Sequence, residues 1–307
     1  MKKGFTFIEM IFVIVIMGIL AKFGAEIFRN VYLNYNQSLV NNKLQTDTTV
    51  AIQQITNRLQ YRIKDSVIAR DSSGFKALSD MNSTDTYNIL EWVGYDIDGW
   101  LGDGGSTNPT WSGFIDVDDA SAIASANTAG TAYLKSTGTD TTRIQAVINN
   151  LSGTTGTNGI NNSAIFFTGA NSDINTDYGW DTTATPTDQN DTAAHRIKSV
   201  AAQIERLATN MSGINKFRGT DIYEQYKLSW TAYALELNTT SGDLTLHYNY
   251  QPWSGDAYTD GNSSLIMKHV STFKFQGAGD IIKLQLCVSD NNMTGDQYSL
   301  CKEKAIF

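Results

Sequence analysis

The stretch MKKGFTFIEMIFVIVIMGILAKFG, residues 1–24, decides how the rest of the chain is placed. Lys2 and Lys3 precede an apolar run, residues 5–21, in which Glu9 is the only charged residue. As a helix this run covers about 25 Å, and the residues after it complete the roughly 30 Å of a bilayer core. The sequence therefore predicts a membrane-spanning helix over residues 5–27. Because lysines precede that helix, the N-terminus is expected in the cytoplasm and the remainder across the membrane.

Glu9 distinguishes three interpretations of this segment. A charged side chain at the centre of a membrane helix costs about 2.5 to 3.5 kcal/mol and is usually paired or functional. A cleaved secretory signal peptide needs a small-residue cleavage site after a short apolar region, and Glu9 is out of place in such a region. A simple membrane anchor explains the length of the run but leaves Glu9 unexplained. A membrane segment whose carboxylate acquires a cationic partner accounts for both the length of the apolar run and the presence of Glu9.

The motif KGFTFIEMIFVIVIMGIL resembles the N-terminus of type IV pilins and of type II secretion pseudopilins. The resemblance implies a leader, residues 1–4, that a prepilin peptidase removes after Gly4 on the cytoplasmic face of the inner membrane. Phe5 then becomes the N-methylated first residue, and Glu9 meets the amine of an adjacent subunit. Such a buried pair sets register between subunits. The expected partners are the peptidase, other pilin or pseudopilin subunits and the inner membrane, with the head in the periplasm.

The helical pattern continues beyond the membrane run. No proline occurs before Pro109, so one long helix is predicted from about Phe5 to about Ser66, with residues 28–70 as the stalk. A membrane helix followed by a separate soluble helix is the alternative. The apolar stripe of the stalk recurs every three or four residues, at Leu44, Thr48, Ile52, Ile55, Leu59 and Ile63.

Two hairpins are predicted near the C-terminus, within a helix-plus-sheet head at residues 192–307. Each has two alternating strands joined by a turn that contains Gly and Asp. The predicted strands are residues 227–237, 243–250, 265–275 and 281–288, with turns at 238–242 and 276–280. Four antiparallel strands crossed by a long helix give an α+β fold. The stretch LIMKHVSTFKFQ, residues 265–276, resembles pseudopilins of the J type and minor pilins of the PilW-like group.

A large loop-rich insertion is predicted at residues 71–191. It is rich in Thr, Ser, Asn, Gly and Asp, yet it holds four of the six tryptophans, which argues against disorder. Short strands are expected there, with a short helix around residues 143–151. An amphipathic helix is predicted to follow at residues 193–211, because its apolar residues recur at helical spacing.

Composition limits the function classes. The net charge is −8, and residues 71–200 hold 16 acidic and 5 basic residues, so no nucleic-acid partner is expected. Three scattered histidines and the absence of catalytic motifs argue against an enzyme. Cys287 and Cys301 are predicted to form a disulfide if the head is exported; in a cytosolic protein they would be free thiols.

Calcium is the remaining cofactor candidate; no other is expected. The segment GYDIDGWLGDGG places Asp96, Asp98 and Asp103 among glycines, and calcium takes six to eight oxygen ligands. The spacing matches only the front of an EF-hand loop, since Thr107 stands where that loop has a glutamate. Solvated acidic loops are the alternative explanation.

These observations predict a minor pseudopilin or minor pilin that assembles into a filament, at its tip or in its initiation. The alternative is an adhesin or ligand-binding subunit anchored by the same type of helix. The sequence does not distinguish secretion, pilus and DNA-uptake systems, which share this N-terminus.

Overall fold

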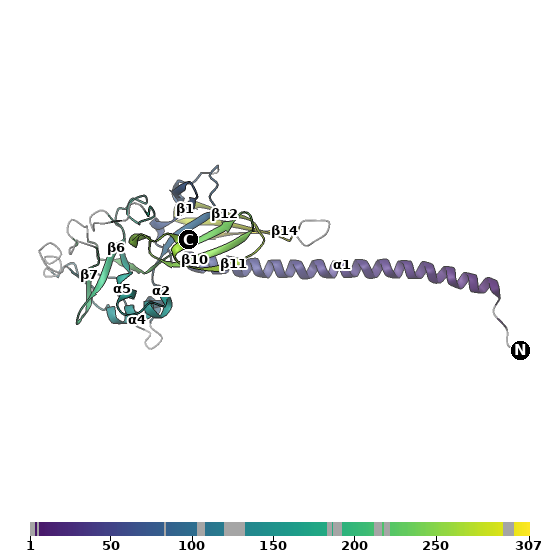
Figure 1. The fold of residues 1–307 in the computed structure, drawn as a ribbon, viewed down its shortest axis with the longest axis horizontal. Coiled ribbons are helices and arrows are strands. Elements are labelled where there is room, and N and C mark those ends of the chain that lie inside the picture. The colour runs from purple at the N-terminus through teal and green to yellow at the C-terminus, as the bar shows by residue number, and fades with distance from the viewer. Residues whose placement is uncertain are drawn as a thin grey trace.

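The computed structural model shows one long helix projecting from a β-rich head (Figure 1). The N-terminus lies at the free end of the helix, and the C-terminus lies within the head. The fold is α+β, as the sequence predicts. The structure describes residues 4, 6–82, 84–102, 108–119, 133–182, 186, 192–211, 217, 222–290 and 298–307.

Helix α1, Phe7–Leu59, has 53 residues and is therefore about 80 Å long. Its N-terminal part is exposed, and its buried residues begin at Thr48. The helix ends seven residues earlier than predicted because the residues after it form backbone hydrogen bonds with residues 93–95, at the end of a strand of the head. Ile63 N–H donates to Val93 O at 2.8 Å, and Tyr95 N–H donates to Tyr61 O at 2.9 Å. A short 3₁₀ helix, η1 (Lys64–Ser66), follows.

The centre of the head is a six-stranded antiparallel sheet in the order β11-β10-β9-β3-β1-β2. Alternate residues of its strands face two different cores. On β3, Leu90 and Trp92 face the core that α1 enters, whereas Ile89 and Val93 face the opposite core. Its strands are β1 (Ile68–Asp71), β2 (Gly74–Ala77), β3 (Ile89–Gly94), β9 (Thr231–Asn238), β10 (Asp243–Tyr250) and β11 (Asn262–Met267).

A second, three-stranded sheet packs with α1 against the first face of the six-stranded sheet. It contains β12 (Val270–Ala278), β13 (Ile281–Asp290) and β14 (Tyr298–Ile306), in that order. Ala51, Ile55 and Leu59 of α1 share one core with residues of both sheets. The last third of α1 is therefore held by the head.

The described residues between 95 and 230 form a second lobe that covers the other face of the six-stranded sheet. Gly94 and Thr231 are paired opposite each other on β3 and β9, so the lobe is inserted at the end of a strand pair. Its five-stranded sheet has the order β4-β7-β6-β5-β8. Its elements are α2 (Ile97–Leu101), β4 (Tyr133–Lys135), α4 (Thr141–Ser152), α5 (Asn158–Asn161), β5 (Ala164–Phe167), β6 (His195–Val200), β7 (Gln203–Thr209) and β8 (Tyr226–Ser229).

The lobe differs in extent from the predicted insertion at residues 71–191. Strands β2 and β3 belong to the six-stranded sheet, and β6 to β8 complete the sheet of the lobe. The short helix expected around residues 143–151 is present as α4. Asp140 caps α4 by accepting hydrogen bonds from the backbone N–H groups of Thr142 and Arg143.

The prediction of an amphipathic helix at residues 193–211 is wrong. This segment is the hairpin β6–β7, which turns at Ala202, a residue with φ 59°. Ile197 and Leu207 are fully buried against the lobe core, whereas Ile204 is 48% exposed. The spacing of apolar residues resembled a helix, but pairing with β4 and β5 on either side stabilises strands instead.

The hairpin β9–β10 is confirmed, but the four predicted C-terminal strands do not form one sheet. The first predicted strand, residues 227–237, is split at Trp230, so that its start belongs to β8 of the five-stranded sheet and its remainder to β9. The run predicted as residues 265–275 is split at His269, which has φ 58°, into β11 and β12 of different sheets. Val270 N–H donates to Gly242 O and fixes this corner. The following turn is also tighter than predicted, with Gly279 and Asp280 joining β12 to β13.

Arg62 connects the end of α1 to the C-terminal strands. This residue is 3% exposed, and its guanidinium donates to the carbonyls of Leu59, Asp280 and Phe307. Burial lowers its pKa, and the Asp280 carboxylate opposes that shift. Each bond to a charged donor contributes about 1.5 to 3 kcal/mol.

We expect Arg62→Met to loosen β14 without unfolding the lobe. The substitution leaves the carbonyls of Asp280 and Phe307 without their donor, so amide exchange in β14 should accelerate at least tenfold. Arg58→Met is the matched control, because Arg58 bonds only the Gln54 carbonyl of its own helix among the described residues. Hydrogen exchange read by mass spectrometry is the measurement. Equal exchange in both variants would contradict the assignment.

Candidate functional site

The first turn of α1 is held by a capping box. The backbone N–H and the Oγ1 hydroxyl of Thr6 both donate to Glu9 Oε2, each at 2.9 Å. This arrangement satisfies N-terminal donors that the helix itself leaves unpaired. The pattern Thr-x-x-Glu is visible in the sequence and could have indicated this cap, but the prediction for Glu9 was pairing between subunits. Thr6 is therefore a partner of Glu9 that the sequence-based prediction missed.

Glu9 retains a second oxygen for another partner. Both hydrogen bonds go to Oε2, and no described residue donates to Oε1. The carboxylate is exposed and lies at the positive end of the helix dipole, which favours a negative charge. Gly4 precedes the helix, and Phe5 lies outside the described residues. Glu9 can thus accept a cation while its cap remains intact.

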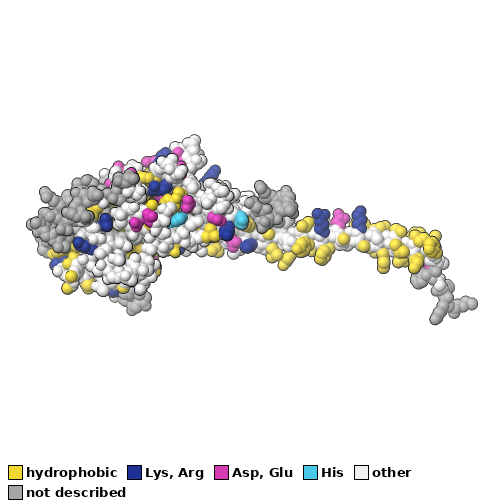
Figure 2. All heavy atoms as spheres, in the orientation of Figure 1, with side chains coloured by type: hydrophobic (Ala, Val, Ile, Leu, Met, Phe, Trp, Pro, Cys, Tyr) yellow, Lys and Arg dark blue, Asp and Glu magenta, His cyan; other side chains and the backbone are white. Residues whose placement is uncertain are grey.

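The N-terminal part of α1 has an apolar surface. Within the described part of the chain, α1 is the one helix long and apolar enough to cross a membrane. Hydrophobic side chains cover its free end (Figure 2), and Phe12 and Ile14 are each more than 60% exposed. After Glu9, the next charged residues of α1 are Lys22, Glu26 and Arg29, four and three residues apart. Such spacing places them on one side of the helix.

The comparison with known protein families matches this segment. Residues 1–21 match the model of the prokaryotic N-terminal methylation motif. The chain thus carries a type IV pilin-like prepilin signal. This signal implies processing by a prepilin peptidase and assembly with other pilins, and it indicates a structural subunit rather than an enzyme. No curated protein and no solved structure matches the chain.

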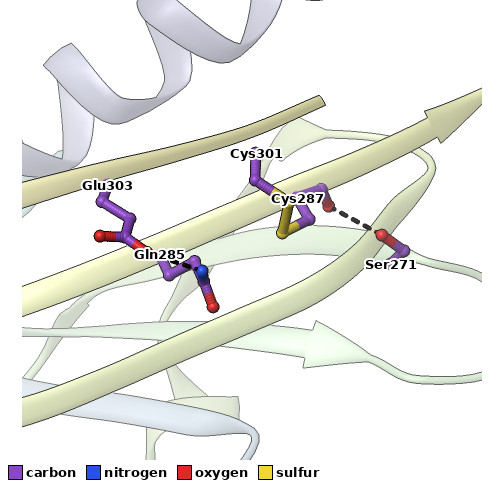
Figure 3. Close-up of a disulfide and its surroundings, with 5 residues drawn as sticks. All are labelled: Ser271, Gln285, Cys287, Cys301 and Glu303. Carbon is purple, nitrogen blue, oxygen red and sulfur yellow. Dashed lines mark hydrogen bonds between the residues drawn. A yellow bond between two sulfur atoms is a disulfide. The ribbon is translucent and has the colours of Figure 1, made fainter. Parts of the chain in front are cut away.

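The predicted disulfide is present in the three-stranded sheet. Cys287 on β13 and Cys301 on β14 lie directly opposite each other, with Cα atoms 4.0 Å apart (Figure 3). Beside them on the same two strands, Gln285 Nε2 donates to Glu303 Oε1 at 2.8 Å (Figure 3). The disulfide secures β14, the strand that packs beside α1.

The three histidines lie apart and serve the fold. His195 is buried beside the Phe167 ring, and desolvation lowers its pKa to about 3, so it is neutral. His247 Nε2 lies 3.1 Å from Glu236 Oε2 on the neighbouring strand. His269 occupies the corner between β11 and β12.

Two of the three residues predicted for calcium, Asp96 and Asp98, lie in the described part of the chain, at the start of α2. Asp96 is 2% exposed and caps α2 by accepting a hydrogen bond from Gly99 N–H at 3.1 Å. Asp98 is exposed, and Asp103 lies outside the described residues. Among the described residues, no group of three or more His, Cys, Asp and Glu side chains is placed to hold a metal ion. In this part of the chain Asp96 acts as a helix cap.

Burial makes the charged form of the Asp96 carboxyl group unfavourable. Its Oδ2 atom and the Oγ1 atom of Thr110 are both buried and lack hydrogen-bond partners. Both atoms lie close to Gly99, since a Cβ added there would stand 2.0 Å from Oδ2 and 2.7 Å from Oγ1. Desolvation, which Gly99 N–H opposes, raises the Asp96 pKa from 3.8 to about 6.

This raised pKa predicts a pH-dependent stability of the second lobe. The folded form binds the proton more tightly than the unfolded form, so the lobe loses stability as the pH rises from about 4 to about 6. The loss is on the order of 2 to 3 kcal/mol and is complete above that window. Asp96→Asn keeps the cap and should remove this loss, raising stability at pH 7.5 relative to wild type.

Thermal unfolding of the detergent-solubilised chain, followed by tryptophan fluorescence at pH 4.5 and 7.5, measures the effect. Asp118→Asn is the matched control, since Asp118 is exposed in the same lobe and should leave the pH dependence of wild type unchanged. If Asp96→Asn and Asp118→Asn behave alike, burial of Asp96 is not the cause.

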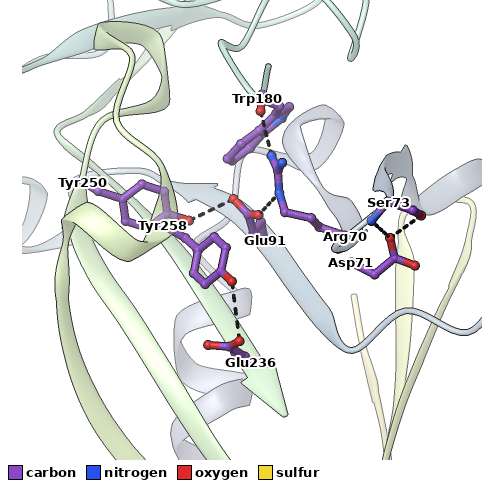
Figure 4. A network of polar contacts seen from close by, with 8 residues as sticks. All are labelled: Arg70, Asp71, Ser73, Glu91, Trp180, Glu236, Tyr250 and Tyr258. Carbon is purple, nitrogen blue, oxygen red and sulfur yellow. Dashed lines mark hydrogen bonds and ion pairs between the residues drawn. The ribbon is translucent and has the colours of Figure 1, made fainter. Parts of the chain in front are cut away.

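A buried polar network joins the two lobes. Glu91 is 1% exposed and accepts hydrogen bonds from Arg70 Nε and, at 3.2 Å, from the Tyr250 hydroxyl (Figure 4). Arg70 Nη2 also donates to Trp180 O of the second lobe at 2.7 Å. Burial raises the Glu91 pKa, and Arg70 opposes the shift. The guanidinium therefore fixes the lobe against the six-stranded sheet; no sequence motif indicated this pairing.

Proposed function

We propose that the protein is a minor pseudopilin or minor pilin, which assembles through α1 into a periplasmic or surface filament. The observation that carries the proposal is the prepilin signal at residues 1–21 on a helix whose apolar N-terminal part is exposed. An isolated helix with such a surface needs a membrane or neighbouring helices around it. The protein acts by assembly.

The shape of the head supports a position at the tip or in initiation. The second lobe lies at the end of the molecule opposite the N-terminus and extends the head beyond α1 (Figure 1). In a filament of parallel subunits, the next head along the axis needs that space. A subunit at the tip has no such neighbour, so the lobe is accommodated there without a clash.

The proposed topology is a single pass, with the N-terminus in the cytoplasm and the head in the periplasm. Lys2 and Lys3 support the orientation, since basic residues flank the cytoplasmic end of membrane helices. Phe28, Tyr32 and Tyr35 are exposed beyond the apolar run, where aromatic residues mark a membrane interface. A disulfide in the head fits an oxidising compartment.

The alternative function, a pilin-anchored adhesin, is favoured by the same distal position of the second lobe. However, the lobe shares a core with the six-stranded sheet, in which Phe166 and Trp180 pack with Val93 and Ala234. Because removing the lobe would expose that face of the sheet, the lobe is a structural part of the head. The assembly role is therefore favoured over the adhesin role.

Mass spectrometry of the membrane-extracted protein tests the processing. We expect a mature chain that begins at Phe5 and carries one N-terminal methyl group. Gly4→Val is the control: a Cβ at Gly4 meets no atom within 4 Å, so the substitution leaves the fold intact. It should block cleavage and leave the leader attached. A wild-type chain that retains Met1 would overturn the proposal.

The Glu9 charge is tested by Glu9→Gln, which keeps an acceptor for Thr6 and removes the negative charge. We expect normal membrane insertion and at least a tenfold loss of incorporation into sheared filaments, measured by immunoblot. Glu26→Gln makes the same change outside the apolar run, and Thr6→Val weakens the cap without removing the charge. Both should be incorporated normally. Equal incorporation of Glu9→Gln would show that the charge does not set register.

A further inference from the structure

An open groove lies on the head where four segments meet. It is lined by parts of residues 62–67, 77–80, 170–175 and 277–282, and its volume is about 670 Å³. This volume falls within the roughly 300 to 1,000 Å³ of typical ligand sites. The segments come from the end of α1, both sheets and the second lobe, so the complete fold is needed to form the groove.

The groove carries an excess of negative charge. Four aspartates line it, against one arginine and one lysine. Both cations already have partners: Arg62 donates to backbone carbonyls, and Lys64 Nζ lies 2.7 Å from Asp280 Oδ2. The three remaining aspartates are exposed and form no ion pair within the described part of the chain: Asp65, Asp80 and Asp173.

A nearby cation does not neutralise these carboxylates. Lys227 stands near the groove and interacts electrostatically with Asp65. Its Nζ atom, however, lies 4.9 Å from the centre of the Tyr95 ring, and Lys227 does not line the groove. Lys76 also interacts electrostatically with Asp80, but its ion-pair partner is Asp85. The Ser79 hydroxyl donates to Asp80 Oδ1, and Asn175 donates to Asp173 Oδ1; these neutral donors leave the negative charges available to a positively charged partner.

Part of the groove lining is apolar. Val67, Leu78 and Ile282 are buried there. A Cβ added to Gly277 would lie 2.8 Å from Leu78 O, so the backbone of β12 rests directly on η2 (Leu78–Asp80). Only a glycine permits this close approach of the two segments.

Two strands that are sheet edges among the described residues reach the groove. Strand β2 is an edge of the six-stranded sheet and β12 is an edge of the three-stranded sheet. Ala77 at the end of β2 and Gly277 on β12 both line the groove. Edge strands offer hydrogen bonds to an added extended chain.

We propose that this groove is the docking site for an extended, lysine- or arginine-bearing segment of a partner protein. The exposed carboxylates pair with its cations, and the edge strands bond its backbone. No aromatic side chain lines the groove for stacking on a sugar, and the carboxylates come from separate elements rather than from one metal-binding cluster. The proposal rests on the head alone and is independent of the role of Glu9.

A labelled peptide tests the proposal with the detergent-solubilised full chain. The probe is a fluorescent octapeptide of alternating Lys and Val, and its counterpart alternates Glu and Val. Fluorescence anisotropy should show saturable binding of the first and none of the second. Absence of binding by the lysine peptide would overturn the proposal.

Matched double variants locate the binding. Asp65→Asn with Asp80→Asn removes two groove carboxylates and should weaken binding at least tenfold. Asp47→Asn with Glu224→Gln removes two exposed carboxylates outside the groove and should change binding less than twofold. Equal weakening by both pairs would show non-specific attraction to an acidic protein and overturn the proposal.

A photo-crosslinking amino acid at Ser79, which lines the groove, should label the lysine peptide. The same amino acid at Ser264, an exposed position on β11 outside the groove, should not. Labelling at Ser264 but not at Ser79 would place the peptide elsewhere and refute the assignment. These variants change exposed residues, so folding is preserved.

Discussion

The buried guanidinium of Arg62 is the connection on which the arrangement of this molecule depends. It lies just beyond the end of α1 and bonds carbonyls of the helix, of the β12–β13 turn and of the C-terminal residue. Together with the packed side chains of α1 and the backbone bridge from Ile63 to Val93, this one side chain ties the helix to both sheets. The disulfide adds a covalent tie between β13 and β14, so the strand beside α1 cannot separate from its neighbour.

The central sheet explains how a large lobe is added without weakening the head. A strand alternates its side chains between two faces, and β3 uses Leu90 and Trp92 for the α1 core and Ile89 and Val93 for the lobe core. Both faces are thereby covered by this one chain. The pairing of Gly94 with Thr231 closes the point of insertion, so residues 95–230 leave the sheet register undisturbed.

Features set by local sequence were predictable, whereas features set by distant contacts were not. The membrane run, the long helix, the short helix at α4 and the β9–β10 hairpin follow from periodicity and turn residues near each other in the chain. The error at residues 193–211 arose because Ile197 and Leu207 fit either a helix or two strands, and pairing with β4 and β5 decided the outcome. Likewise, the division of the run near His269 depends on a contact with Gly242.

The N-terminal site shows why a carboxylate can be placed in an apolar segment. In the isolated chain, Glu9 Oε2 accepts two hydrogen bonds from Thr6, which reduces the cost of exposing the charge to lipid. Because Oε1 receives no donor from the described residues, an amine from another subunit can bind without breaking the cap. In the proposed filament, the gain on assembly is then the full value of a new charge-assisted bond in a low-dielectric environment. A carboxylate that had to exchange its cap for the new partner would gain much less, and the proposed register between subunits would be correspondingly weaker.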